Sequence, residues 1–336
     1  MWLLARELAR SRAFPQIIVT GRHTQLAGRL RADGVPVREC DWDAGLDPRV
    51  LLAIAAELRS GPALLHAHDA HALTLAGMVA ALSRTPLVVT RRVDFPLRRR
   101  GFWRRADRVI AISEAVARVL RGDGIDPRRI VVIHSGVDLT EARRAVPAGF
   151  RGDLGLSDSA KLAVNVGALV PHKDHATLLR SAAHLRERLP DLHWAIAGEG
   201  PLRGELERLR ERLGLGKCVH LLGHVPNPLN LLAEADVFVM SSREEGLGTS
   251  VLDAMACGIP VASTTAGGLP EMLGDGAGIL VPPEQPEPLA AAVATLLDDP
   301  EIRTQVRDRA RVIVQGFSAE RMAEQVGTVY RSCATN

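Results

Sequence analysis

Residues Ser241–Glu271 read SSREEGLGTSVLDAMACGIPVASTTAGGLPE, and the apolar run DVFVM ends just before them. The apolar run predicts a buried strand, REEGLG the loop at its carboxyl end, and TSVLDAMACG a helix that Gly258 terminates. In open α/β sheets, ligands bind at the carboxyl ends of strands and phosphates at the N-terminus of the next helix. The stretch therefore predicts a binding site in an α/β fold, with free backbone amides near Gly248 and Ser250 for an anion.

Two carboxylates accompany these amides. Glu245 lies in the loop, and Asp253 lies two turns into the helix. Carboxylates accept hydrogen bonds from sugar hydroxyls, so a nucleotide sugar would offer a diphosphate to the amides and hydroxyls to both acids. The spacing alone equally allows an ordinary helix with an Asp in its second turn beside a solvated acidic loop.

The composition is that of an ordinary globular protein, with 46% hydrophobic and 24% charged residues among 336. That length predicts two domains. No apolar run could span a membrane and no signal peptide is evident, so we expect a cytoplasmic protein, with peripheral contact at the inner face of the cell membrane. The cysteines share no metal-ligand spacing and are expected to be reduced thiols: Cys40, Cys218, Cys257 and Cys333.

Apolar β-branched runs alternate with helical patterns throughout, which predicts parallel sheets covered by helices on both faces. The predicted strands of the first half are QIIVT, LLHAH, LVVTR, RVIAIS and RIVVIH, and those of the second are LAVNVG, HWAIAG, VHLLG, DVFVM, PVAST and GILVP. We expect two doubly wound domains. Their predicted bounds are 1–139 and 161–316, with a linker at 140–160 and a C-terminal helix at 317–336 that packs back toward the first domain.

Residues 1–139 hold 22 arginines against 14 acidic residues, a net charge of +8, whereas the remainder is acidic. Much of this charge lies in the basic segment Thr90–Arg108, TRRVDFPLRRRGFWRRADR, with Phe95, Phe102 and Trp103 interleaved. The segment predicts contact with an anionic membrane or a phosphorylated acceptor, and a solvated basic loop is the alternative. Nucleic acid is disfavoured because no known binding module accompanies the charge. The arginines concerned are Arg91, Arg92, Arg98, Arg99, Arg100, Arg104 and Arg105.

SSREEGLGTSVLDAMACGIPVAS resembles the Glu-x7-Glu signature of the family-4 retaining glycosyltransferases, which have the GT-B fold. The segments VGALVPHKDHATLLRSAAHL, AGEGPLRGELE, LLGHV, GGLPEML and GILVPPEQPEPLAAAV follow in the order of that family, and the resemblance extends from about Pro62 to the end. It implies two Rossmann-like domains facing a cleft, the first for the acceptor and the second for the donor. The implied reaction moves a sugar from a UDP- or GDP-linked donor to a glycan or lipid of the cell envelope, with retention and without metal or cofactor.

Carried onto this chain, the resemblance puts Glu245 at the donor sugar and Asp253 at the ribose. The family has Glu at the second position, and Asp reaches roughly 1.5 Å less far. Lys173 in PHKDH takes the diphosphate position, and Ala168 stands where the family often has Arg. The other implied donor contacts are Gly198, His224 and Val225 near the base, and Gly248, Thr249, Gly267 and Gly268 near the phosphates or sugar.

The run LLHAHDAHAL places His66 and His68 on one face of a strand, followed by Asp69 and His71. These four side chains could suggest a metal site. The resemblance instead places His68 near the transferred sugar, so we assign His68 and Glu245 to catalysis and no residue to a metal. His66 has a buried structural imidazole as its alternative.

The chain opens in a helical pattern, MWLLARELARS, where the family has a strand and a Gly-rich turn. We therefore expect either a truncated N-terminal domain or a misassigned start. Two other hypotheses follow. One is an inactive protein that still binds a nucleotide sugar, and the other is a sugar-nucleotide epimerase of the same fold.

Overall fold

The structure is a computed structural model that describes residues 1–41, 46–61, 63–97 and 101–334. Contacts between residues divide the chain into two units, which are described separately. Unit 1 comprises Met1–Gly136 and Ser318–Asn336, and unit 2 comprises Val137–Phe317. The segment 140–160, which we expected to be a linker, is therefore part of unit 2.

Unit 2 contains a six-stranded parallel sheet in the order β12-β11-β10-β7-β8-β9. Its strands are β7 (Lys161–Val166), β8 (Leu192–Ala197), β9 (Val219–Gly223), β10 (Val237–Met240), β11 (Val261–Thr264) and β12 (Ile279–Val281). Its longer helices are α8 (His175–Leu185), α9 (Arg203–Arg212), α11 (Thr249–Ala256), α13 (Pro286–Asp298) and α14 (Pro300–Ile313). Its shorter helices are α6 (Leu139–Arg143), α7 (Phe150–Asp153), η4 (Pro171–Lys173), α10 (Pro228–Leu232), α12 (Leu269–Leu273) and η5 (Val314–Phe317).

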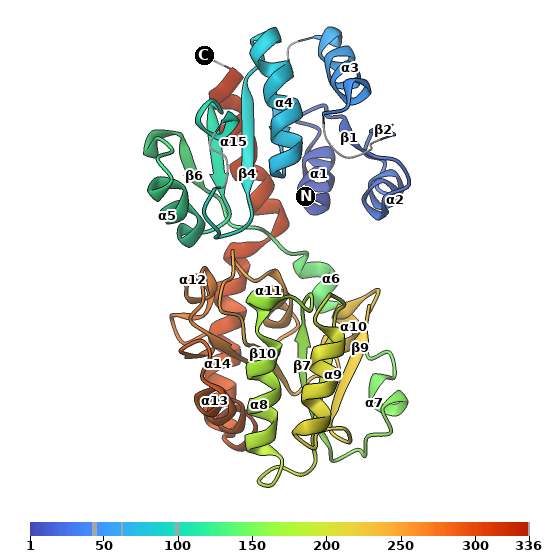
Figure 1. The fold of residues 1–336 in the computed structure, drawn as a ribbon, viewed down its shortest axis with the longest axis vertical. Helices are drawn as coiled ribbons and strands as arrows, with labels where there is room; N and C mark the ends of the chain where they lie inside the picture. The colour runs from blue at the N-terminus through green and yellow to red at the C-terminus, as the bar shows by residue number, and fades with distance from the viewer. Residues whose placement is uncertain (42–45, 62, 98–100, 335–336) are drawn as a thin grey trace. The chain divides into compact units, whose positions relative to one another are not determined.

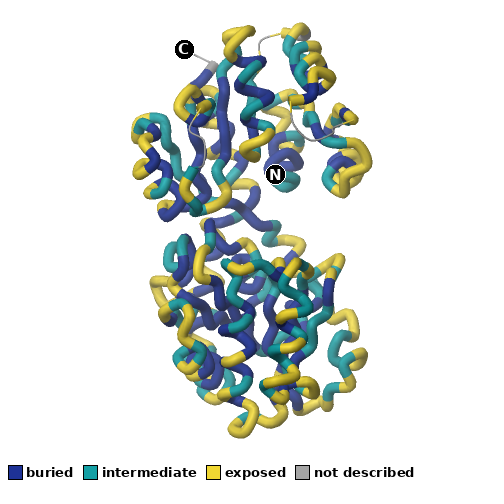
Figure 2. The backbone as a smooth tube through the Cα atoms, in the orientation of Figure 1, coloured by how far each residue is buried: buried dark blue, intermediate teal, exposed yellow. Residues whose placement is uncertain are grey.

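The strands of unit 2 are apolar on both faces because helices cover both faces. Val237 and Val239 of β10 pack into a core shared with α8, α9 and α13 (Figure 1). Phe238 and Met240 alternate with them and are equally buried, on the face where α11 contacts β10 and β11. Figure 2 shows this buried interior of unit 2, with the exposed residues on its outer loops.

Unit 1 has its parallel strands in two sheets, one of β1 and β2 and one in the order β3-β4-β5-β6. The strands are β1 (Ile18–Gly21), β2 (Val37–Cys40), β3 (Leu65–Ala67), β4 (Leu87–Arg91), β5 (Arg108–Ala111) and β6 (Ile130–Val132). The helices are α1 (Trp2–Ser11), α2 (Gln25–Ala32), α3 (Pro48–Glu57), η1 (Leu58–Ser60), α4 (Ala70–Ser83), η2 (Phe102–Arg104), α5 (Glu114–Gly122), η3 (Pro127–Arg129) and α15 (Ala319–Ala334).

The parallel α/β architecture is confirmed in both units, but β2 was not among the predicted strands. Its sequence, VREC, has two charged residues in four, so it lacks the apolar run by which we recognised the others. Only Cys40 of this strand is buried.

The C-terminal helix α15 packs on α1 within unit 1. Val326 of α15 shares a core with Leu4 and Leu8 of α1 and with Val88 of the sheet (Figure 1). The chain leaves unit 1 after Gly136 and re-enters it at Ser318, and these two residues are in close contact. A Cβ on Gly136 would lie 2.5 Å from the carbonyl oxygen of Ser318. No side chain larger than hydrogen fits there without moving the backbone.

The start of unit 2 is anchored by one carboxylate. Glu234 is 7% exposed. Its Oε1 accepts hydrogen bonds from the backbone N–H groups of Ala148, Gly149 and Phe150 at 2.8–3.0 Å, and its Oε2 accepts one from Arg151 at 2.8 Å. Burial opposes ionisation, but the four N–H groups outweigh it and lower the pKa of Glu234.

We predict that Glu234→Gln lowers the free energy of unfolding by about 1–3 kcal/mol at neutral pH, because an amide cannot accept all four bonds. A lowered carboxyl pKa stabilises the fold above the ordinary pKa, and that contribution disappears as the pH falls through the lowered value. Urea unfolding of both proteins should therefore differ at neutral pH and converge below about pH 4. Identical curves at neutral pH would contradict this role.

Candidate functional site

The predicted donor residues of unit 2 gather at one edge of its sheet. All six strands run parallel, so their carboxyl ends share an edge, and the strand order reverses between β7 and β10, where such sheets bind ligands. Lys173 follows β7, Gly198 follows β8, His224 and Val225 follow β9, Glu245, Gly248 and Thr249 follow β10, and Gly267 and Gly268 follow β11.

Lys173 and Glu245 form an ion pair at this edge, between the Lys173 ammonium and Glu245 Oε2. Their side chains are 16% and 12% exposed, and Ser242 Oγ lies 3.3 Å from the same carboxylate oxygen. An ammonium has three N–H donors, so Lys173 can keep Glu245 and still bind a phosphate oxygen. The family resemblance predicts both residues near the donor, but it did not predict this contact.

The loops that follow β10 and β11 are tied together. Gly268 N–H donates to the carbonyl oxygen of Glu245 at 2.9 Å, and Thr264 Oγ1 donates to that of Ser242 at 2.6 Å. Gly248 precedes the first residue of α11 with φ of 96°, and as a glycine it has no side chain to cap this helix. The N-cap residue therefore takes up none of the first amides of α11, the groups that we predict to bind an anion.

The loops after β7 and β8 approach so closely that glycine is required. Gly198 has φ of 151°, and a Cβ there would lie 1.9 Å from the carbonyl oxygen of Gly167. His224, which follows β9, is exposed, and Val225 is half-buried.

Asp253 lies in the second turn of α11. Burial, together with the charge of Glu141 on α6, raises its pKa to about 7. Within the described residues, no group donates a hydrogen bond to this carboxylate. An unused acceptor is what a ribose contact requires, although the shorter Asp side chain stands where the family has Glu.

In unit 1, His66 and His68 lie at the end of β3 with their ring centroids 4.1 Å apart. His66 Nδ1 is 2.6 Å from the Tyr330 hydroxyl and Nε2 is 2.7 Å from Thr90 Oγ1. Burial lowers the pKa of His66 to about 3, so the ring is neutral and hydrogen-bonded on both sides. The structural interpretation therefore holds for His66.

His68 differs from its neighbour because its buried Nδ1 has no hydrogen-bond partner in the described part of the chain. Asp69 caps α4, since its Oδ1 accepts from the N–H groups of His71 and Ala72 at 2.8 Å. Across residues 1–41, 46–61, 63–97 and 101–334, no three His, Cys, Asp or Glu side chains are grouped to hold a metal.

The aromatic residues of the basic segment are not positioned as we expected. Trp103 is 4% exposed. The guanidinium carbon of Arg91 lies over the Trp103 ring, 5.4 Å from the ring centroid. Phe102 packs on α4 at Gly77. The expectation that Trp103 inserts into a membrane is therefore wrong, because its ring is already buried in the protein. Arg98, Arg99 and Arg100 lie outside the described residues.

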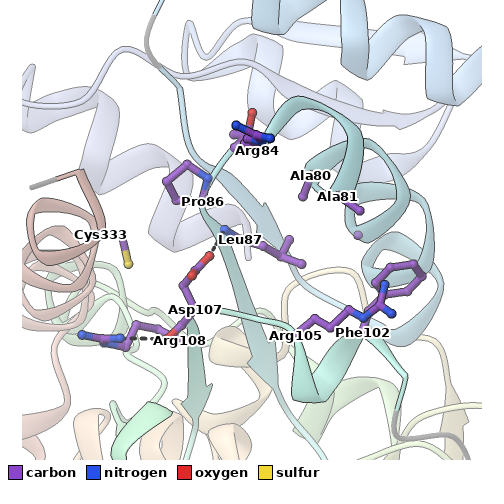
Figure 3. Close-up of a pocket in the computed structure, with 12 residues that line it drawn as sticks. Ala80, Ala81, Arg84, Pro86, Leu87, Phe102, Arg105, Asp107, Arg108 and Cys333 are labelled. Carbon is purple, nitrogen blue, oxygen red and sulfur yellow. Dashed lines mark hydrogen bonds between the residues drawn. The ribbon is translucent and has the colours of Figure 1, made fainter. Parts of the chain in front are cut away.

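A pocket of about 370 Å³ in unit 1 lies away from the predicted site residues. Figure 3 shows Pro86, Leu87, Asp107 and Arg108 around it, where β4 and β5 begin. His68 follows the carboxyl end of β3, the opposite edge of the same parallel sheet. The pocket is therefore not the candidate site.

None of the helices in the described residues is both long and apolar enough to cross a membrane.

Comparison with known proteins identifies the family. Residues 149–312 match the profile of the glycosyl transferases group 1, and residues 1–141 match that of glycosyltransferase family 4. The two matches together span most of the chain. It belongs to the family-4 glycosyltransferases.

Curated relatives of this family member include the D-inositol 3-phosphate glycosyltransferase of Corynebacterium urealyticum, 34% identical over 244 residues, which are 68% of this chain and 58% of the relative. The alpha-D-kanosaminyltransferase of Streptomyces kanamyceticus is 32% identical over 196 residues, 57% of this chain and 50% of that protein. The chain thus spans a little over half the length of the curated relatives it matches.

Solved structures show the same fold. The structure of Anabaena Alr3699/HepE in complex with UDP-glucose superposes with a TM-score of 0.88 at 22% identity, covering 98% of this chain and 95% of that chain. A glycosyltransferase from Rickettsia africae gives a TM-score of 0.85 at 19% identity, covering 99% and 94%. This family member has the GT-B fold.

The raised pKa of Asp253 predicts a pH-dependent stability. Because ionisation of a carboxyl with a raised pKa opposes folding, the protein gains stability as the pH falls from about 7, the raised pKa, to about 4, the ordinary pKa of an Asp. Asp253→Asn should melt above wild type at about pH 8, and wild type should recover this difference as the pH is lowered. Histidines titrate in both proteins and cancel in the difference. Melting temperatures that stay parallel over this range would contradict the raised pKa.

Proposed function

We propose that this protein transfers a sugar from a nucleoside-diphosphate sugar to an acceptor, with the donor bound at the carboxyl edge of the unit 2 sheet. The observation that carries the proposal is the ion pair of Lys173 and Glu245 beside the N-terminus of α11, where the N-cap residue is a glycine. Lys173 and the amides would stabilise negative charge on the leaving diphosphate, and Glu245 would accept hydrogen bonds from the sugar.

We further propose that the sugar is a hexose or a related unit, that UDP or GDP carries it, and that transfer retains the anomeric configuration. The spacing of Glu245 and Asp253, which resembles the signature of retaining family-4 enzymes, supports this. A metal ion is not needed in the proposal, because Lys173 and the helix amides would face the diphosphate. We assign the base to no side chain, since the leaving phosphate itself can accept the proton of the acceptor.

For the acceptor we propose a glycan or lipid precursor of the cell envelope, bound by unit 1 near His68. The net charge of +8 on residues 1–139 supports an acceptor that carries phosphate. Relatives named for D-inositol 3-phosphate glycosyl transfer agree with that chemistry. His68 has a free ring nitrogen for an acceptor or sugar hydroxyl, whereas both nitrogens of His66 are occupied.

We predict that Glu245→Ala abolishes sugar transfer and that Lys173→Ala raises the donor KM at least tenfold, through loss of charge-assisted contacts. The measurement is turnover of UDP- and GDP-sugars with and without acceptor, in the presence of EDTA. Transfer needs an acceptor, epimerisation does not, and an inactive donor-binding protein shows neither. Wild-type kinetics in both variants would contradict the donor site. Activity that is lost in EDTA and restored by Mg²⁺ or Mn²⁺ would contradict metal independence.

We also propose that the basic segment contacts an anionic membrane. Changing Arg98, Arg99 and Arg100 to Glu should weaken binding to vesicles containing phosphatidylglycerol, because the surface attraction reverses. The matched control changes three exposed arginines elsewhere in unit 1 to Glu, namely Arg12, Arg59 and Arg118. Donor binding should be the same in both triple variants. Equal vesicle binding by the two variants would leave the segment as a solvated loop.

A further inference from the structure

A buried polar pair lies directly behind Lys173. Asn165 is 3% exposed in the otherwise apolar interior of β7, and its Nδ2 donates to the carbonyl oxygen of Val239 in β10 at 2.8 Å. The Asn165 Oδ1 lies 3.0 Å from Nε2 of His175, the first residue of α8. One amide side chain therefore joins both central strands to the helix that follows Lys173.

The two hydrogen bonds of Asn165 determine the state of the His175 ring. Since the Asn165 amide nitrogen donates to Val239, its oxygen must accept, so His175 Nε2 carries the hydrogen. The other ring nitrogen, Nδ1, is buried without a partner in the described part of the chain, and the side chain is 1% exposed. Burial, together with the charge of Lys173, lowers the pKa of His175 to about 4, so the ring is neutral at physiological pH.

Packing alone does not account for this pair. An apolar side chain of similar size would fill the same space without leaving a buried nitrogen unpaired, and replacing a buried polar pair by apolar groups is often neutral or stabilising. Unlike apolar packing, the hydrogen bond between Asn165 and His175 is directional, and it links the end of β7 to the start of α8. Lys173 lies two residues before that start.

The backbone of Lys173 is held on both sides. Its carbonyl oxygen accepts a hydrogen bond from Ser241 Oγ at 3.0 Å. On the other side, Asp174 has φ of 46°, a strained conformation for a residue with a side chain, and His175 is fixed to Asn165. The side chains of Lys173 and Asn165 both lie close to Gly167. A Cβ on Gly167 would lie 3.8 Å from Lys173 Cδ and 3.9 Å from Asn165 Oδ1.

We propose that Asn165 and His175 are positioning residues, which hold the Pro171–Lys173 turn so that the Lys173 ammonium meets the diphosphate of the donor. This rests on the proposed function. Because the ring of His175 is neutral, Lys173 remains the cation of this turn, and the pair orients it without adding charge. A shift of about 1 Å in such a group is enough to weaken its contact severely.

The test measures nucleotide binding, which needs no acceptor. UDP and GDP are titrated into wild type by calorimetry, and the tighter ligand is the probe. Two variants remove the link, His175→Met and Asn165→Leu, so that one suffices if the other fails to fold. His175→Gln keeps an N–H donor at a similar distance from Asn165. Ser181→Ala is the matched control, because it removes another buried hydrogen bond of α8, from Ser181 Oγ to the carbonyl oxygen of Thr177.

We expect both removal variants to weaken nucleotide binding on the order of tenfold. His175→Gln and Ser181→Ala should bind within about threefold of wild type, whatever their melting temperatures. A purely structural role would lower the melting temperature and leave the Kd of the folded protein unchanged. The link to Lys173 is tested by repeating His175→Met and Asn165→Leu in a Lys173→Met background, where they should have no further effect on Kd.

Two outcomes overturn the inference. One is wild-type Kd in the folded removal variants, and the other is an equal loss with and without Lys173, which would mean that the pair acts on the unit as a whole. Failure of the proposed function looks different. In that case neither UDP nor GDP binds wild type, or Lys173→Met has no effect on Kd.

Discussion

The candidate site depends on β7 and β10 lying side by side in the centre of the unit 2 sheet. The chain adds β8 and β9 on one side of β7 and then returns to place β10 on the other. In the parallel register Ala163 pairs with Val237, so the two strands end nearly level. Their following loops therefore meet, and Lys173 can pair with Glu245 although 72 residues separate them.

Polar groups at this edge satisfy one another, which keeps the loops in place. Ser241 binds the Lys173 backbone, Thr264 binds the loop that carries Glu245, and Asn165 ties the two central strands to α8. These side chains are buried, so each unmade bond would carry a desolvation cost. The result is a fixed set of loops around the N-terminus of α11.

Unit 1 shows the same division between fixed and free groups at the end of β3. His66 is held by Tyr330 and Thr90, whereas Nδ1 of its neighbour His68 has no partner among the residues that the structure describes. Tyr330 comes from α15, at the far end of the sequence. The C-terminal helix thus contributes to the surroundings of His68, which no local pattern in LLHAHDAHAL could indicate.

The sequence by itself determined the parallel α/β class, the strands with long apolar runs, and the placement of Lys173, Glu245 and the glycine loops at strand ends, because these follow from periodicity and local turn chemistry. Only the tertiary structure decided which distant groups touch. The Lys173–Glu245 pair, the burial of Trp103 under Arg91, the raised pKa of Asp253 and the Asn165–His175 link all depend on strand order and on helices packed from elsewhere. Such contacts join residues that are far apart in sequence, and no local pattern encodes their distance or their desolvation.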